Sequence, residues 1–342
     1  MSYEVLGITV LWIFLFGYLI VASIDFGAGF FSYYSSITGT RHIIHNVIER
    51  YLSPVWEVTN VFLVFFFVGF VGFFPDTAFY YGTALLVPGS IAIVLLAVRG
   101  SYYAFSTYGS RTNKTYMLLY GASGLLIPAS LSTVLTISEG GYIEVTADGK
   151  VQFLFQKLFT STYSWSVVLL AIVSVLYISA MFLCYYAFKA GDRPAFEIVR
   201  KYALAWSLPT IMSSLLVFFA IHRHNPEHFE GMLSLSWVFV LSFLCFIAAV
   251  YLVWSRKRLG WAFLFVMLQF AFAFFGYGAG HLPYILYPYL TIYDNFTNEA
   301  MAIALVIVFI LGLLLLIPSL YLLMRLFLFD AKYVQGKSGK HK

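Results

Sequence analysis

The chain has 342 residues, of which 61% are hydrophobic and only 10% are charged. Soluble proteins carry about 45–50% apolar and about 25% charged residues, because their surfaces must remain polar. This composition excludes a soluble enzyme, a disordered protein and a nucleic-acid-binding protein, and it indicates a chain embedded in lipid.

Nine apolar runs are long enough to cross a bilayer as helices, which takes about 20 residues each. The first run has neither a basic leading segment nor a small-residue cleavage site, so we expect a retained helix rather than a signal peptide. In chain order the expected spans are residues 5–24, 58–75, 77–98, 115–138, 158–188, 202–221, 231–255, 259–280 and 300–324. The sequence therefore predicts an all-α integral membrane protein with nine transmembrane helices.

The basic residues predict how these helices are oriented. With the N-terminus outside, all but three of the 20 Lys and Arg residues fall on the cytoplasmic side. The exceptions are Lys150, Lys157 and Arg223. Cytoplasmic loops of membrane proteins are enriched in Lys and Arg, so we expect the N-terminus outside and the C-terminus inside. The same bias accounts for the net charge of +5 without a nucleic-acid partner.

Three ionisable residues stand at the cytoplasmic ends of three consecutive predicted spans. Asp25 follows the first span, Glu57 precedes the second and Arg99 ends the third. Ionisable residues within membranes are costly and often functional. One interpretation is a proton path or an ion site at the inner mouth of the helices. The other is structural: Glu57 complements a helix N-terminus, Arg99 anchors the inner surface, and Asp25 is their salt-bridge partner.

The histidines favour structural or surface positions. His222, His224 and His228 fall in one predicted outer loop, where Pro226 breaks a helical alignment of the last two. We therefore expect a solvated loop and no metal site. His281 closes the eighth span at the outer edge, where an interfacial role is favoured over a haem or quinone contact. Since no two histidines lie within spans at matching depth, no bis-histidine haem site is expected.

The first hundred residues carry a series of motifs in a recognisable order. Residues 22–29 read Ala-Ser-Ile-Asp-Phe-Gly-Ala-Gly, similar to an Asp-Gly-Phe-Asp-x-Gly-x-Gly motif. Residues 54–59 read Pro-Val-Trp-Glu-Val-Thr, similar to Pro-x-Trp-Asp-Gly-Asn, and a Phe-Pro and an Arg-Gly pair follow. The motif residues that match are Asp25, Gly27, Gly29, Trp56, Pro75 and Arg99. Three positions depart from the pattern: Ala22, Val58 and Thr59.

Together with the predicted topology, these motifs resemble subunit II of the cytochrome bd-type quinol oxidases. The resemblance implies a single membrane domain over residues 1–342, built from two four-helix bundles and a peripheral helix. Residues 1–138 would form the first bundle, 155–280 the second, 300–328 the ninth helix and 329–342 a cytoplasmic tail.

The resemblance also implies a role in a bacterial plasma-membrane complex. The partner, subunit I, would carry haems b and d, oxidise quinol near the outer face and reduce oxygen to water with protons from the cytoplasm. This chain would bind no cofactor directly, would scaffold subunit I, and would offer Asp25, Glu57 and Arg99 as candidates for a proton path. A small single-helix subunit and membrane lipid are further expected partners.

The alternatives are a stand-alone secondary transporter and a purely structural membrane scaffold. Transporters carry broken helices and buried polar groups near the bilayer midplane. The predicted spans here are nearly free of charge, and their notable mid-span breaks are Pro128, Pro209 and Pro318. This pattern favours the oxidase hypothesis.

Overall fold

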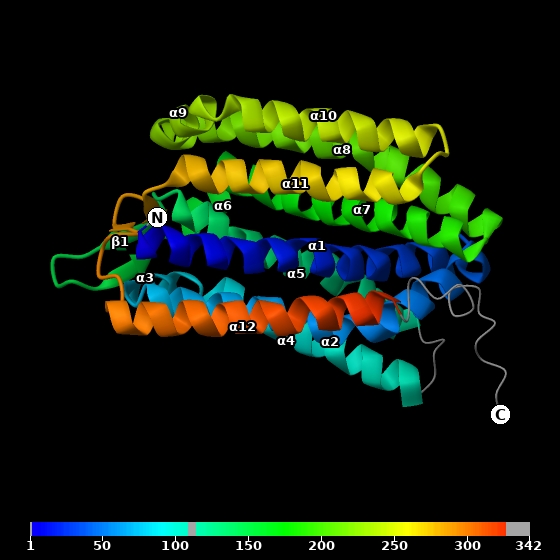
Figure 1. The fold of residues 1–342 in the computed structure, drawn as a ribbon, viewed down its shortest axis with the longest axis horizontal. Coiled ribbons are helices and arrows are strands. Elements are labelled where there is room, and N and C mark those ends of the chain that lie inside the picture. Colours follow the sequence, from blue (N-terminus) through cyan, green and yellow to red (C-terminus); the bar gives the residue numbers. More distant parts are fainter. Residues whose placement is uncertain (1, 109–113, 326–342) are drawn as a thin grey trace.

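The computed structural model describes residues 2–108 and 114–325, and the side chains of all of these except residues 45–46, 49–58, 103–108, 114 and 323–324. Long helices run side by side along the length of the molecule (Figure 1). The helices are α1 (Tyr3–Ile37), α2 (Arg41–Phe73), α3 (Asp76–Ala84), α4 (Leu86–Tyr108), α5 (Lys114–Ser138), α6 (Phe155–Thr160), α7 (Thr162–Ala190), α8 (Arg193–His224), α9 (Pro226–Ser234), α10 (Ser236–Trp254), α11 (Leu259–His281) and α12 (Glu299–Met324).

Two short antiparallel hairpins are the only strands in the described residues, and both lie in loops. One pairs β1 (Ile143–Val145) with β2 (Val151–Phe153), and the other pairs β3 (Tyr284–Leu286) with β4 (Leu290–Thr291). The first hairpin turns through Gly149, whose φ of +74° favours glycine. The fold is otherwise helical, as the composition predicts.

Within the described residues, seven helices are long and apolar enough to cross a membrane, or eight if α3 and α4 together form one span. α2 adds a shorter apolar segment, Thr59–Phe73. Each predicted span is mostly helical, but Leu85, Ser161 and Leu235 interrupt three of them. The count of nine membrane crossings stays a prediction. The helices also run unbroken through Pro128, Pro209 and Pro318, so these prolines are not the breaks that we expected from the sequence.

The breaks lie instead between short and long helices in two similar places. α3 and α4 meet at Leu85 with a bend of 77°, and α9 and α10 meet at Leu235. Each short helix has a proline at its start: Pro75 stands just before α3, and Pro226 is the first residue of α9. Proline suits a helix start, because the backbone N–H that it lacks would have no partner within the helix there. The third predicted span, residues 77–98, is therefore interrupted.

Side-chain caps fix where several helices begin. Asp192 Oδ1 accepts a hydrogen bond from the Ala195 backbone N–H at 3.1 Å, at the start of α8. Asn225 and Asn298 cap α9 and α12 in the same way. Such caps satisfy backbone donors that have no partner within the helix, so these polar residues determine the loop positions between apolar runs.

α7 lies at the centre of the molecule, between α8, α1 and α5. In its most apolar stretch 72% of the residues are buried, against 39% or less in the other long apolar helices of the described chain. Gly27 of α1 allows the close approach, because an added Cβ would lie 2.4 Å from Ser179 Cβ of α7. The Ser179 hydroxyl donates to the Ile24 carbonyl at 2.9 Å, which ties the two helices together.

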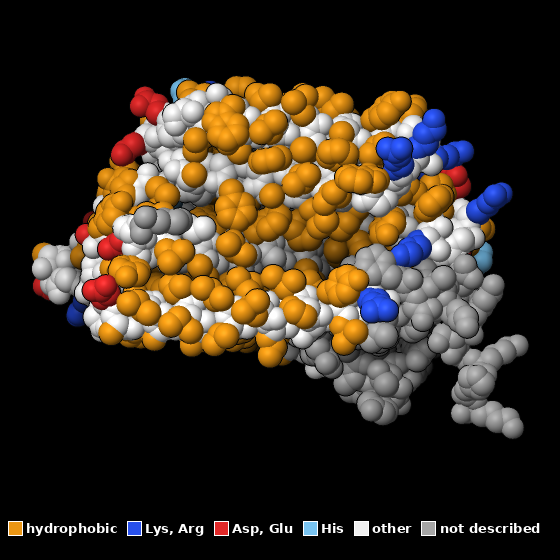
Figure 2. Space-filling view, in the orientation of Figure 1, with side chains coloured by type: hydrophobic (Ala, Val, Ile, Leu, Met, Phe, Trp, Pro, Cys, Tyr) orange, Lys and Arg blue, Asp and Glu red, His pale blue; other side chains and the backbone are white. Residues whose placement is uncertain are grey.

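Charge is segregated between the two ends of the molecule. On the face shown in Figure 2, Lys and Arg gather at one end, most acidic residues lie at the other, and a hydrophobic band covers the helices between them. The N-terminus and β1 lie at the acidic end (Figure 1). This distribution is what the positive-inside rule expects of a chain whose basic end faces the cytoplasm.

Candidate functional site

The first candidate site is a buried ion pair between Asp25 of α1 and Arg99 of α4. Arg99 Nε donates to Asp25 Oδ2 at 2.9 Å, and the two residues are 0% and 1% exposed. The other two guanidinium nitrogens donate to backbone carbonyls, to that of Asp25 at 2.6 Å and to that of Tyr120 on α5 at 3.0 Å. One guanidinium therefore holds three helices together.

Aromatic rings and a glycine enclose this pair. The Arg99 Cζ atom lies 4.0 Å from the ring centre of Tyr120 and 5.2 Å from that of Phe26, a geometry that stabilises a buried cation. The Tyr120 hydroxyl donates to Asp25 Oδ1 at 3.4 Å. At Gly29 an added Cβ would lie 3.0 Å from both terminal guanidinium nitrogens, so this motif glycine makes room for the arginine.

The structure thus brings together two of the three residues predicted at this depth. The side chains of Glu57 and Trp56 lie outside the described residues, so the expectation that Glu57 joins the pair stays a prediction. Pro75 stands directly before α3 and adopts a helical conformation there. Gly27 packs against α7 rather than against the ion pair.

A second cluster surrounds Glu139, the residue that follows α5. Its carboxylate is 2% exposed. Asn225 Nδ2 donates to Oε2 at 2.9 Å, and the Tyr277 hydroxyl donates to Oε1. His228 Nδ1 lies 2.8 Å from Oε1 and 3.0 Å from Oε2, and His281 Nδ1 lies 3.6 Å from Oε1.

These partners favour the ionised form of the carboxylate. Burial alone would raise the pKa of Glu139, but the hydrogen bond from His228, the nearby charges of His281 and His228, and the Tyr277 hydroxyl together hold it below its ordinary value. The site is therefore built around a buried carboxylate anion.

The prediction of a solvated histidine loop is wrong for His228. Residues 222–228 are not a loop, because α8 continues to His224 and α9 begins at Pro226. Asn225 caps α9 and thereby turns His228 inward, where it is 3% exposed. His224 stacks between the rings of Tyr142 and Tyr163, and its Nε2 lies 3.1 Å from the Gly140 carbonyl oxygen.

Sequence reasoning missed Glu139 as a site residue, although one signal pointed to it. Glu139, His228 and His281 all stand near the same predicted end of their spans, as Asp25 and Arg99 do at the other. The Asn-Pro pair at 225–226 is also a typical helix start. His281 is interfacial in sequence but 8% exposed in the structure, with its ring centroid 4.7 Å from that of His228.

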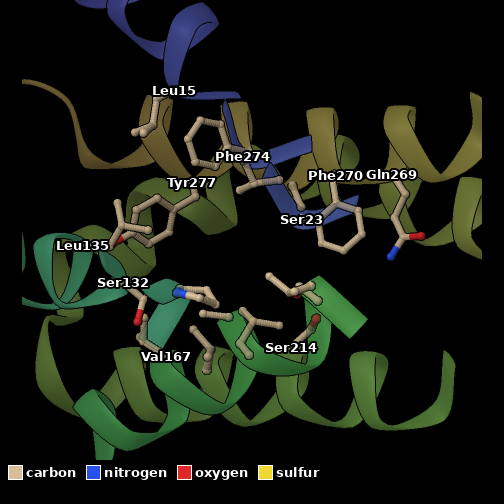
Figure 3. A pocket seen from close by; sticks show the side chains of 18 of the residues that line it. Leu15, Ser23, Ser132, Leu135, Val167, Ser214, Gln269, Phe270, Phe274 and Tyr277 are labelled. Carbon is tan, nitrogen blue, oxygen red and sulfur yellow. The ribbon is translucent and has the colours of Figure 1, made fainter. Parts of the chain in front are cut away.

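A cavity of about 590 Å³ lies among the helices next to this cluster. Side chains from α1, α5, α7, α8 and α11 point into it, and most of them are apolar (Figure 3). Tyr277 and Tyr163 line the cavity and also meet the cluster, since their hydroxyls lie 3.4 Å apart and Tyr277 donates to Glu139. Ser23, Ser214 and Gln269 provide polar groups in its wall (Figure 3).

Comparison with known proteins identifies the family. A family model described as cytochrome bd terminal oxidase subunit II matches residues 3–327. The chain belongs to this family. The match confirms the predicted family, subunit II of a quinol oxidase of the respiratory chain. It argues against the alternative of a stand-alone transporter.

Two relatives show how far the likeness extends. A putative cytochrome bd menaquinol oxidase subunit II from Bacillus subtilis (strain 168) is 33% identical over 340 residues, which covers 96% of this chain and 97% of that one. A solved structure of bd oxidase from Geobacillus thermodenitrificans contains a chain with 64% identity and a TM-score of 0.85, covering 96% of this chain and 100% of that one. The resemblance seen in the first hundred residues therefore extends over nearly the whole subunit, a multi-pass protein of the bacterial plasma membrane. A bd oxidase complex implies a partner oxidase subunit and haems in that partner.

Proposed function

We propose that this chain is a haem-free scaffold subunit of an oxidase that oxidises quinol near the outer membrane face and reduces oxygen to water with cytoplasmic protons. The observation that carries the scaffold role is the Asp25–Arg99 pair. Its donated hydrogen bonds join α1, α4 and α5, so these buried charges hold the helices of this chain together. The name of the Bacillus subtilis relative supports menaquinol as the substrate of the complex.

The absence of haem from this chain has a direct test. The predicted spans place no two histidines at matching depth, which a bis-histidine haem site would need. We expect the chain purified without its partner to contain no haem, measured as the pyridine haemochrome. His281→Ala should leave the haem spectra of the complex unchanged. Haem bound to the isolated chain, or loss of one haem in that variant, would contradict the proposal.

Proton transfer is a second candidate function, favoured by one specific observation. Asp25 is a buried carboxylate that contacts the Tyr120 hydroxyl and the Arg99 guanidinium, and ionisable groups within membranes often mark proton relays. In this proposal Glu57 and Asp25 pass cytoplasmic protons toward the partner's haems.

Oxygen uptake driven by quinol, measured per haem in the purified complex, tests the proton path. We expect Glu57→Gln to slow turnover at least several-fold with haem content and assembly unchanged. Glu197→Gln is the matched control, because Glu197 is a half-exposed carboxylate that pairs with Arg256. Wild-type turnover in the Asp25→Asn/Glu57→Gln double variant would remove this chain from the proton path and leave the scaffold role. Mass spectrometry of the same complex would detect a small single-helix subunit and bound lipid.

A further inference from the structure

We propose that Glu139, His228 and His281 form a binding site for one divalent transition-metal ion of the Zn²⁺ class. The three residues come from separate elements: the end of α5, α9 and the last residue of α11. All three are buried, and one ligand atom from each lies within 4.8 Å of the others. The inference rests on this geometry and is independent of the proposed function.

The donor set and its spacing suit zinc. One carboxylate and two imidazoles form a known zinc ligand set, with bonds of about 2.0–2.2 Å. Tetrahedral bonds of that length place ligand atoms about 3.3 Å apart. In the structure His228 Nδ1 and His281 Nδ1 lie 2.8 and 3.6 Å from Glu139 Oε1. These two distances lie on either side of that spacing, and the ligand atoms of all three residues lie within 4.8 Å of one another.

The hydrogen bond of His228 to the backbone defines which nitrogen is available. His228 Nε2 lies 3.0 Å from the Tyr277 carbonyl oxygen, which can only accept, so Nε2 carries a proton. Nδ1 then faces the Glu139 carboxylate, which only accepts. Either a proton on Nδ1 or a metal ion between the two groups satisfies this contact. A histidine that donates its other N–H to a carbonyl is the usual form of a metal ligand.

His281 is the second buried imidazole of the cluster, and one of its ring nitrogens lacks a hydrogen-bond partner in the described part of the chain. Its Nε2 is buried and has no hydrogen-bond partner among the described residues, and the residue is only 8% exposed. An unsatisfied buried polar atom destabilises a fold by about 1–3 kcal/mol. Nδ1 is the ring nitrogen that lies near Glu139 and is the one that would bind a metal there, while the ring also hydrogen-bonds the Ser138 backbone.

Two further residues act as positioning groups for the carboxylate. Asn225 donates to Oε2 and Tyr277 donates to Oε1. Such outer hydrogen bonds fix the orientation of metal-binding carboxylates. They leave the remaining lone pairs of Glu139 directed at the two imidazoles.

Zinc binding by the purified oxidase complex tests the site. The complex is stripped with dipicolinate, incubated with Zn²⁺, dialysed and analysed by mass spectrometry for metal per haem-containing complex. The control is His222→Ala, which changes an exposed histidine close by in the sequence. We expect wild type and this control each to retain one zinc ion per complex more than Glu139→Gln or His281→Ala does. X-ray absorption at the zinc edge should show nitrogen and oxygen neighbours at about 2.0 Å with imidazole scattering.

Two results would overturn the proposal. One is a wild-type complex that retains no more zinc than Glu139→Gln. The other is equal retention by His281→Ala and His222→Ala, which would assign any bound zinc to another place in the complex. If Glu139→Gln fails to assemble, His281→Ala decides alone, because the contact of His281 with the carboxylate is the longer of the two histidine contacts, at 3.6 Å. Either result would mean that a proton joins His228 to Glu139, and neither bears on the haem and turnover tests.

Discussion

Removing the charge of Asp25 should strongly destabilise the subunit. Asp25→Asn leaves the Arg99 guanidinium fully buried, since Arg99 is 0% exposed, and takes away the carboxylate charge 2.9 Å from it. Breaking a buried pair from one side costs about 3–5 kcal/mol, because the remaining charge is uncompensated. The rings of Tyr120 and Phe26 contact the guanidinium before and after the substitution, so they do not offset this difference. We therefore expect a net loss of about 3–5 kcal/mol.

Arg99→Lys separates the charge from the geometry of the guanidinium. Lysine keeps the ion pair with Asp25 but cannot direct donors at two carbonyls and a carboxylate at once. Each hydrogen bond from a charged donor contributes about 1.5–3 kcal/mol, so the loss of one such bond should make this variant less stable than wild type by about 2 kcal/mol.

The assay is unfolding of the purified complex in sodium dodecyl sulfate, with the yield of assembled, haem-containing complex as a second readout. The double variant Asp25→Asn/Arg99→Gln should lose less unfolding free energy than the two single variants lose together, because it removes both charges of the pair at once. A stability of Asp25→Asn within about 0.5 kcal/mol of wild type, the range typical of surface substitutions, would refute the reasoning.

Two further predictions concern orientation and packing. Labelling of single cysteines at Glu230 and Lys257, both exposed, should place residue 230 outside and residue 257 in the cytoplasm, and the reverse pattern would overturn the predicted N-outside topology. Gly124→Ala should destabilise the complex by about 1–3 kcal/mol through overpacking, because the new Cβ would lie 2.3 Å from the Phe26 carbonyl oxygen. Gly82→Ala, where no atom lies within 4 Å, is the matched control, and equal melting temperatures of the two variants would count against this packing argument.

The hydrophobic pattern predicts the helices of this fold well, because a bilayer demands long apolar runs that are easily read. The depth of Asp25 and Arg99 follows from the same runs, since each residue stands at a countable distance along its helix. Their contact across 74 residues is consistent with that depth. The roles of Asp25, Glu57 and Arg99 stay predictions.

The features that were missed depend on contacts that no local pattern encodes. The break at Leu85 lies inside a continuous apolar run, so hydrophobicity alone gives no sign of it. His228 stands in a polar stretch that is typical of a loop, and its burial depends on Glu139, 89 residues earlier. Hydrophobic periodicity identifies which face of a helix is buried, but not which distant residue that face meets.

The central place of α7 has a consequence for how the chain is made. Helices enter the membrane in the order of synthesis. Ser179 is made 155 residues after Ile24, its hydrogen-bond partner in α1. At about 5–20 residues per second this separation takes about 10–30 s. Arg99 arrives much sooner, 74 residues after Asp25. The early ion pair thus holds α1 against α4 while the small-residue face around Gly27 still lacks α7. Cross-linking of stalled nascent chains should detect the α1–α4 contact first, and α1–α7 contacts forming before it would contradict this order of assembly.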